Sequence, residues 1–362
     1  MGQIQAKVSA EALLHRLAAG QALDREDYLC LIEQQQTLAE PAAALARQAR
    51  RRTYGDRVFI RGLIEISNHC RNNCYYCGIR AGNRAVERYR LSEEEILASA
   101  SAGYALGFRS FVLQGGEDPQ YTDEYLCRIV RELKRRYGDC AVTLSLGERS
   151  YESYRMLREA GADRYLLRHE TANGEHYAQL HPPSMSHAAR LQCLHWLQEL
   201  GYQTGAGFMV GSPGQTLKHL ADEMLFLRQL RPQMVGIGPF LPQRDTPLHA
   251  HAPGSAELTI FLLSLIRLML PEVLLPATTA LGTADPMGRE KGIMAGANVL
   301  MPNLSPPDVR GKYLLYDNKI HTGVEAAQHI EALRERIRKT GCEIVIDRGD
   351  HIGKTGENHH EL

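Results

Sequence analysis

The sequence has no excess of charge of either sign and no long basic run. Its 362 residues carry 42 Lys and Arg against 42 Asp and Glu, so the formal net charge is zero. A protein that follows the phosphates of a nucleic acid usually presents a basic surface. We therefore expect small-molecule or protein partners and no nucleic acid.

The sequence also lacks the features of a membrane or secreted protein. No apolar signal segment occupies the N-terminus, and Ala6 stands where a myristoylation signal needs Ser or Thr. The most apolar stretch, residues 259–280, is interrupted by Arg267, Pro271 and Glu272, which prevents it from crossing a bilayer as one uniform helix. These absences predict a soluble, cytoplasmic protein with no membrane partner.

Most of the 8 cysteines stand apart from one another, which argues against a disulfide framework and favours a reducing compartment. The isolated ones are Cys30, Cys127, Cys140, Cys193 and Cys342. The other three, Cys70, Cys74 and Cys77, form a CxxxCxxC run. This spacing brings three thiolates to one side of a short turn, enough to hold three irons of a cubane cluster and leave the fourth without a protein ligand. A metal with an open position can bind a small molecule directly.

Two other interpretations of the cysteines are open. Cys74 and Cys77 alone form a CxxC, which fits a redox dithiol or half of a zinc site. Zinc needs a fourth ligand, but His69 is too close to Cys70 in the chain, and no second CxxC or HxxxH follows at zinc-finger distance. With an aromatic residue, Tyr76, before the last cysteine, the run resembles the cluster-binding loop of radical S-adenosylmethionine (SAM) enzymes.

From about residue 57 onward, short β-branched runs alternate with longer amphipathic segments. The runs are residues 58–66, 110–113, 141–146, 164–167, 203–210, 234–237, 274–277 and 298–301. Helices are expected at residues 123–136, 190–200, 217–230 and 258–270, and one near Ser92, where Ser-Glu-Glu-Glu resembles a capping box. Eight such units predict an α/β fold, a (β/α)8 TIM barrel. A doubly wound sheet is the rival, but it often carries a GxGxxG turn, and none is evident.

The chain around this barrel is expected to form extensions. We assign residues 1–55 to an N-terminal helical extension, 56–323 to the barrel, and 324–362 to a C-terminal helix and tail with a short strand at 343–346. Because a barrel gathers the carboxyl ends of its strands at one mouth, the polar residues that follow the strands are the candidate site.

Several strand ends carry residues suited to binding. The run Gln114-Gly115-Gly116-Glu117-Asp118 lets backbone approach a ligand closely and looks like the glycine-rich motif that holds the amino group of SAM. Glu170 suits the amino or ribose groups of SAM, and Arg190 suits its carboxylate. Arg168 and Glu170 alternate with His169, which should then point toward the helices in a structural role.

Further along the chain, Thr278 and Thr279 end the seventh run, where their hydroxyls can donate to an anionic or cyanide-like ligand. Tyr313 and Tyr316 would lie one turn apart in a helix and could close the barrel mouth. Each of these pairs also fits plain packing, since threonine favours strands and tyrosine fills cores.

The strand ends together resemble the radical SAM maturase of FeFe hydrogenases, over roughly residues 57–316. The similar runs are LQGGEDP from residue 113, TLSLGE from 143, ADRYLLRHETAN from 162, VGIGPF from 235 and PATTA from 276. That family lies beside biotin synthase and methylornithine synthase. The resemblance implies a closed barrel with a 4Fe-4S cluster and SAM near one end and a substrate cavity toward the other.

The resemblance also implies roles for particular residues. Cluster ligands would be Cys70, Cys74 and Cys77; SAM would contact Gln114, Gly116, Glu117, Glu170 and Arg190; and the substrate cavity would be formed by Arg168, Thr278, Thr279, Met301, Tyr313 and Tyr316. One-electron reduction would cleave SAM to a 5'-deoxyadenosyl radical. The implied task is assembly of the diiron subcluster (H-cluster) of hydrogenase from an iron-cysteine species with CO and CN ligands.

The implied partners are an electron donor such as flavodoxin or ferredoxin and the other hydrogenase maturases. Two alternatives are a radical SAM enzyme acting on a small amino-acid-derived substrate and a non-catalytic iron-sulfur carrier. Some family members carry a second cysteine triplet near the C-terminus, but residues 319–332 contain no cysteine and Cys342 stands alone. We therefore predict one cluster.

Overall fold

A parallel six-stranded sheet forms the centre of the molecule in a computed structural model that describes residues 8–320 and 326–353. Its strands, in spatial order, are β2 (Gly62–Ser67), β3 (Ser110–Gly115), β4 (Ala141–Ser145), β5 (Arg164–Leu166), β6 (Gln203–Ala206) and β8 (Met234–Val235). Their apolar side chains are almost all buried, as expected for parallel strands covered on both faces.

Isolated parallel bridges continue the sheet and close it. Met234 pairs with Leu274, Pro276 pairs with Val299, and Leu63 of β2, the first strand of the sheet, pairs with Asn303. The cycle therefore has eight parallel segments, which confirms the predicted (β/α)8 barrel. The seventh run, 274–277, contributes bridges instead of a regular strand.

Two of the predicted runs are each divided between two sheets. Residues 58–66 comprise β1 (Arg57–Ile60) and β2, and β1 pairs with β10 (Val299–Leu300) and β11 (Glu343–Val345). Residues 203–210 comprise β6 and β7 (Met209–Val210), and β7 pairs with β9 (Gly238–Pro239). The second break falls at Gly207, where φ is +156° and a Cβ atom would lie 2.0 Å from the carbonyl oxygen of Gly236.

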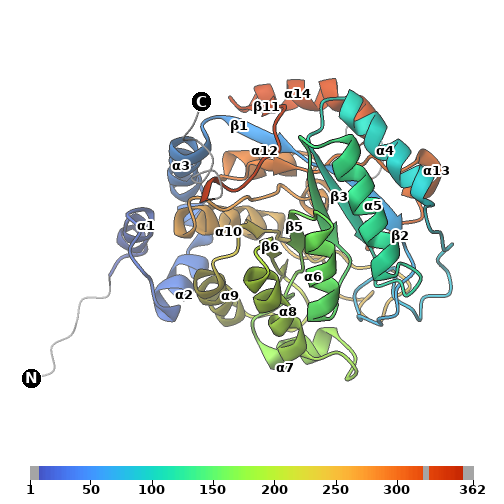
Figure 1. The fold of residues 1–362 in the computed structure, drawn as a ribbon. Helices are drawn as coiled ribbons and strands as arrows, with labels where there is room; N and C mark the ends of the chain where they lie inside the picture. The colour runs from blue at the N-terminus through green and yellow to red at the C-terminus, as the bar shows by residue number, and fades with distance from the viewer. Residues whose placement is uncertain (1–7, 321–325, 354–362) are drawn as a thin grey trace, which may run out of the picture.

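Helices surround the strands (Figure 1). They are α4 (Glu93–Ala105), α5 (Asp123–Arg136), α6 (Tyr151–Glu159), α7 (Gly174–Leu180), α8 (His187–Glu199), α9 (Leu217–Leu230), α10 (Ala256–Met269), α11 (Thr279–Ala284), α12 (Gly288–Met294) and α13 (Pro307–Arg310). The predicted capping box is confirmed: the Ser92 hydroxyl accepts from the Glu95 amide while the Glu95 carboxylate accepts from the Ser92 amide.

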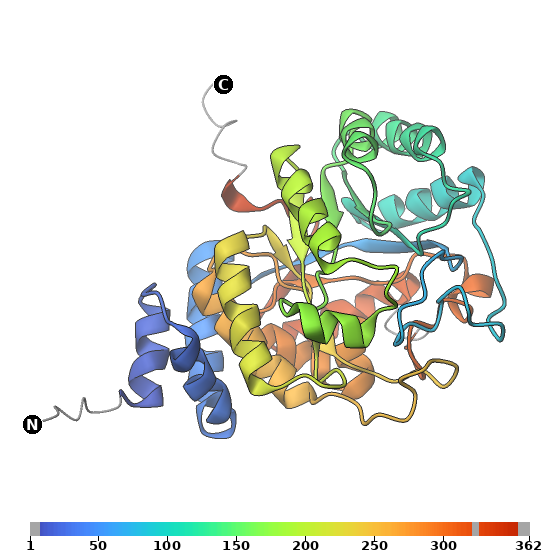
Figure 2. The same cartoon turned by 90° about the horizontal axis from the view of Figure 1, so that it is seen from below.

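Three helices precede the barrel: α1 (Ala10–Ala18), α2 (Arg25–Glu33) and α3 (Gln35–Tyr54). α3 packs along α10 and α2 packs against α9, where Arg25 donates two hydrogen bonds to the Asp222 carboxylate. In Figure 2 these dark-blue helices lie on the side of the molecule opposite the light-blue loop that carries the cysteines.

The C-terminal part comprises η2 (Ala327–His329), α14 (Ile330–Arg338) and β11, which confirms the predicted helix and short strand. The following segment packs at the amino ends of the barrel strands, where the Asp350 carboxylate accepts from Arg164 at 2.6 Å and Gln203 at 2.8 Å. The predicted boundary between residues 323 and 324 lies outside the described residues. Over the described ranges, no helix combines the length and apolarity that a membrane crossing requires.

Candidate functional site

Backbone hydrogen bonds fasten the cysteine loop to three separate parts of the barrel mouth. The Arg71 amide donates to the Glu117 carbonyl, which follows β3, at 3.0 Å. The Tyr75 and Gly78 amides donate to the carbonyls of Leu180 and Leu315, each at 2.9 Å. The loop is therefore held in place by the fold before any ligand binds.

One arginine joins the two ends of this loop. The Arg88 guanidinium donates to the Asn68 carbonyl before the cysteines, and to the carbonyls of Ile79 at 2.8 Å, Arg80 at 2.6 Å and Asn83 at 3.0 Å after them. A guanidinium offers five donors in a planar fork, which suits several carbonyls at once.

The three thiols are half-buried and form no disulfide. Burial raises the pKa of Cys77 to about 12, with a further contribution from Cys70, and burial together with Cys77 raises the pKa of Cys74. Three thiolates can share this site only beside compensating cations, so the donor set fits a metal cluster. Among the described residues, no three His, Cys, Asp or Glu side chains surround the position of a single ion. Thiolates of a cluster bind different irons, so they need not meet at one point.

The glycine turn at the end of β3, which includes Gly116, packs directly against the cysteine loop. A Cβ atom at Gly116 would lie 2.2 Å from the His69 carbonyl oxygen and 2.7 Å from the Cys70 Cβ. No side chain fits there, so this glycine allows the two segments to touch.

A cavity of about 270 Å³ opens beside the cysteine loop at the barrel mouth. It is lined by residues from five strand ends and from the loops that face them. Predicted site residues in its wall are Cys77, Gln114, Arg168, Glu170, Arg190, Tyr313 and Tyr316. The volume is near the lower end of the range for small-molecule sites.

Two ion pairs lie at the cavity, and three of their four side chains, those of Arg168, Glu170 and Arg190, line it. Arg190 Nε lies 2.7 Å from a Glu148 carboxylate oxygen, and Arg168 Nη2 lies 3.3 Å from a Glu170 carboxylate oxygen. In each pair, at least one nitrogen and one oxygen are buried without a well-aligned hydrogen bond. Burying polar atoms in this way destabilises the fold unless a ligand forms hydrogen bonds with them. The four side chains therefore suit a charged, polar ligand.

The charges of the first pair are unequally stabilised. Burial alone would lower the pKa of Arg190, but Glu148, Tyr177 and Tyr76 together raise it above its usual range. Burial raises the pKa of Glu148, and Arg190 only partly opposes that effect. The guanidinium therefore remains a firm cation, suited to a carboxylate ligand.

Glu170 adopts a left-handed backbone with φ of +69°. This conformation is strained for a residue with a side chain, and such strain is concentrated at functional sites. The prediction for its neighbour is confirmed: His169 is fully buried and its ring shares a 2.7 Å hydrogen bond with Glu223 of α9.

Other predicted residues lie outside the wall of this cavity. The Glu117 carboxylate turns toward Arg71, at 2.9 Å from its Nε. The Thr278 hydroxyl caps α11 and also donates to the Ile237 carbonyl, and the Thr279 hydroxyl accepts from Arg289.

Met301, which the family resemblance places at the substrate cavity, packs against an apolar cluster that includes Tyr54, Phe59 and Met234. The tyrosines need a correction, because α13 ends at Arg310 and Tyr313 and Tyr316 are therefore not on one helix. Both nevertheless line the cavity.

Sequence reasoning did not assign a binding role to Glu148, which contacts Arg190, or to Tyr76, which lines the cavity. Glu148 directly follows a predicted strand, and that position was the available signal. The residues where some relatives carry further cysteines include 321–325, which lie outside the described ranges. Cys342 is buried after α14.

Comparison with known proteins agrees with this arrangement. The model of the radical SAM superfamily matches residues 64–227. The FeFe hydrogenase maturase subunit HydE of Thermotoga maritima is 50% identical over 276 residues, which are 76% of this chain and 78% of that protein. The 3-methylornithine synthase of Methanosarcina acetivorans is 29% identical over 83% of each chain.

Solved structures share the fold. Methylornithine synthase PylB superposes with a TM-score of 0.81 at 26% identity, over 92% of this chain and 97% of that one. The maturase HydG from Carboxydothermus hydrogenoformans superposes with a TM-score of 0.74 at 21% identity, over 92% and 78% of the two chains, and supports the fold alone. The chain therefore belongs to the radical SAM superfamily of enzymes and, within it, to the family of the FeFe hydrogenase maturase HydE.

Proposed function

We propose that this chain is a radical SAM maturase that takes part in assembling the diiron subcluster of FeFe hydrogenase. The observation that carries the proposal is the junction of the cysteine loop with a cavity walled by Cys77, Glu170 and Arg190. The 50% identity to a HydE maturase supports the choice of reaction within the superfamily.

Cys70, Cys74 and Cys77 would hold three irons of a single 4Fe-4S cluster, which leaves one iron for SAM. The Arg190 guanidinium would receive the SAM carboxylate, since it is a firm buried cation whose Nε contacts Glu148 without a well-aligned hydrogen bond. Glu170 would receive the amino or ribose groups, and Gln114 and Gly116 complete the proposed set of direct contacts, with Glu117 beside them. With both groups bound, the site supplies one-electron cleavage of SAM to methionine and a 5'-deoxyadenosyl radical.

The remaining wall would orient the substrate. Arg168, Tyr313 and Tyr316 lie on the cavity and would bind an anionic or sulfur-bearing group. Thr278, Thr279 and Met301 are proposed to act deeper in the barrel. The proposed substrate is an iron-cysteine species with CO and CN ligands, and the proposed partners are the other maturases and a flavodoxin or ferredoxin.

The function is tested by anaerobic reconstitution with iron and sulfide, followed by SAM and dithionite. We expect 5'-deoxyadenosine and methionine in equal amounts. Cys74→Ala should lose iron and both products together, whereas the matched control Cys30→Ala, at an isolated cysteine in α2, should retain them. An intact cluster that yields neither product would instead indicate an iron-sulfur carrier.

The substrate is tested separately, because the relation to 3-methylornithine synthase favours a small amino-acid-derived substrate as the second candidate. The reconstituted chain is added to apo-hydrogenase with the other two maturases, and hydrogen evolution is measured. Activity that depends on this chain supports the proposal. Amino-acid rearrangement without hydrogenase activation would favour the second candidate.

A further inference from the structure

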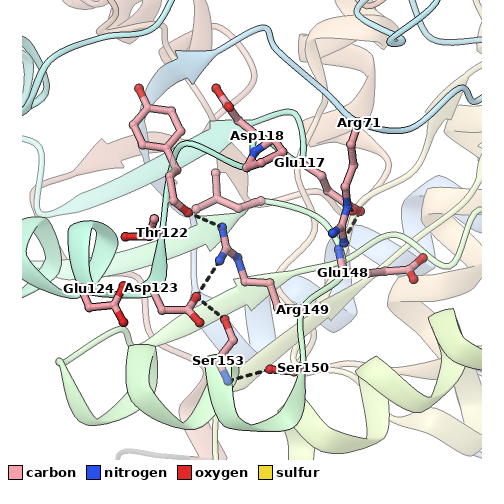
Figure 3. A pocket seen from close by; sticks show the side chains of 13 residues that line it. Arg71, Glu117, Asp118, Thr122, Asp123, Glu124, Glu148, Arg149, Ser150 and Ser153 are labelled. Carbon is pink, nitrogen blue, oxygen red and sulfur yellow. Dashed lines mark hydrogen bonds and ion pairs between the residues drawn. The ribbon is translucent and has the colours of Figure 1, made fainter.

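Glu117 lies between two segments that must keep their relative positions at the mouth of the barrel, the cysteine loop and the end of β4. One carboxylate oxygen accepts a hydrogen bond from the Glu148 amide, which follows β4, at 2.8 Å. The other accepts from Arg71 Nε, one residue after Cys70, at 2.9 Å. Figure 3 shows Glu117 between Arg71 and Glu148, with its carboxylate at the Arg71 guanidinium.

The backbone around this carboxylate is shaped to receive it. Gly147 has a φ of +75°, and a Cβ atom there would lie 2.1 Å from the Glu117 Cγ. The main chain of Glu117 also accepts from the Arg71 amide at 3.0 Å. Glu117 therefore makes both main-chain and side-chain contacts with the cysteine loop.

The segment after β4 leads to the SAM side of the site. Glu148, whose amide is held by Glu117, uses its own carboxylate to contact Arg190 at 2.7 Å. Arg190 lines the cavity beside Cys77. A continuous series of contacts thus runs from the residue after Cys70, through Glu117 and Glu148, to the guanidinium proposed to receive the SAM carboxylate.

The Glu117 side chain is not placed as a direct ligand. It lines a separate depression of about 350 Å³ together with Arg71, Glu148 and Arg149, and it is absent from the wall of the cavity that holds Arg190 and Glu170. Both of its oxygens accept well-aligned hydrogen bonds, whereas a buried oxygen of Glu148 and one of Glu170 contact an arginine without such a bond.

We propose that Glu117 is a positioning residue that sets the distance between the cysteine loop and Arg190, and that its carboxylate does not bind the SAM ammonium group. This inference rests on the proposed function, because it assumes that SAM occupies the cavity. Its most important contact is the hydrogen bond from the partly buried Glu148 amide. The Arg71 pair matters less, because the Arg71 side chain is 60% exposed and exposed pairs are weak.

The comparison of Glu117→Gln with Glu117→Ala tests the assignment. Gln keeps an oxygen for the Glu148 amide but loses the charge, while Ala loses both. SAM binding to the reconstituted protein is measured by equilibrium dialysis and normalised to cluster content, and the electron paramagnetic resonance spectrum of the reduced cluster is recorded with and without SAM. Arg71→Ala is the matched control for the exposed ion pair.

We expect Glu117→Ala to weaken SAM binding about tenfold, equivalent to one hydrogen bond to a charged group. Glu117→Gln and Arg71→Ala should bind SAM within about twofold of the original chain and retain its SAM-induced spectral change. If the carboxylate binds the SAM ammonium, Gln will be as defective as Ala, and that result overturns the proposal.

Loss of the cluster in Glu117→Ala and failure of the unaltered chain to bind SAM would have different meanings. If Glu117→Ala holds no cluster, the comparison of Glu117→Gln with the unaltered chain decides alone: unchanged SAM affinity supports the positioning role, and a tenfold loss contradicts it. If the unaltered chain binds its cluster but fails to bind or cleave SAM, the proposed function fails, whatever the variants do.

Discussion

Arg190 Nε lies 2.7 Å from a carboxylate oxygen of Glu148; both side chains are largely buried, and Arg190 lines the cavity. The pair joins a helix, α8, to the end of β4. Because neither group has ideal hydrogen-bond geometry with the other, the guanidinium retains capacity for a second anion.

The first prediction concerns this pair. Arg190→Lys should weaken SAM binding by roughly 10- to 100-fold, because an ammonium cannot contact Glu148 and the SAM carboxylate with a planar fork. Equilibrium dialysis of the reconstituted variant measures the effect, and iron content serves as its internal control. Unchanged affinity would show that the SAM carboxylate binds elsewhere.

The second prediction concerns the closure of the cysteine loop. Arg88→Ala should lose most of its iron on reconstitution and become less stable by about 2–3 kcal/mol, because several hydrogen bonds of roughly 1 kcal/mol each are removed. Iron analysis and urea unfolding provide the measurements. Arg84→Ala, at an exposed position in the same loop, is the control and should behave like the original chain. Full iron content in Arg88→Ala would contradict the assigned role.

The third prediction separates strain from binding at Glu170, whose φ is +69°. Glu170→Gly should abolish SAM binding yet increase the free energy of unfolding by about 1 kcal/mol, because glycine adopts this backbone without strain. Glu170→Ala should also lose SAM binding, but its free energy of unfolding should not increase. The two free energies are compared by urea unfolding of the cluster-free proteins, and equal values would indicate that the backbone is unstrained.

The fourth prediction concerns pH and the amino end of the barrel. Burial opposes ionisation of Asp350, but Arg164 and Arg348 hold its pKa well below the usual value. A carboxyl with a lowered pKa stabilises the fold above its unfolded pKa of about 3.9, and this stabilisation is lost as the pH falls further.

Asp350→Asn should therefore lower the free energy of unfolding by about 2 kcal/mol at pH 7, because it removes the carboxylate that pairs with the buried Arg164. The difference in the free energy of unfolding between the variant and the original chain should become smaller as the pH falls below about 4. Urea unfolding of cluster-free protein across this range is the measurement, and Glu152→Gln, in an exposed pair with Arg155, is the control. A constant difference at all pH values would contradict the electrostatic explanation.

Local sequence signals identified many elements well. Ser92 indicated the start of α4, because its hydroxyl satisfies a free amide at the helix end. The break of residues 58–66 into β1 and β2 was not predictable, because both halves are apolar and only their pairing with β10 or β3 distinguishes them. The same limit applies to Gly207, whose neighbour across the sheet is Gly236.

In the site, too, the sequence identified candidate residues but did not predict which side chains contact one another. Strand-end position selected Glu170, and a place on the following helix selected Arg190; the two do line one cavity. Strand-end position could not tell that Glu117 turns toward Arg71 or that Glu148 reaches Arg190, because side-chain direction at a strand end depends on the neighbouring loops. Tyr313 and Tyr316 would lie one turn apart only if their segment were helical, but both reach the cavity from irregular backbone after α13.

The sequence by itself determined the cysteine spacing, the alternation of strands and helices, and the polar residues at the strand ends, since these depend on local periodicity and ligand chemistry. Only the tertiary structure decided which of those residues share a cavity and which hold its walls in place. The physical reason is that hydrogen bonds such as those of Arg88 and Glu117 join segments distant in the chain, and no local pattern records their geometry.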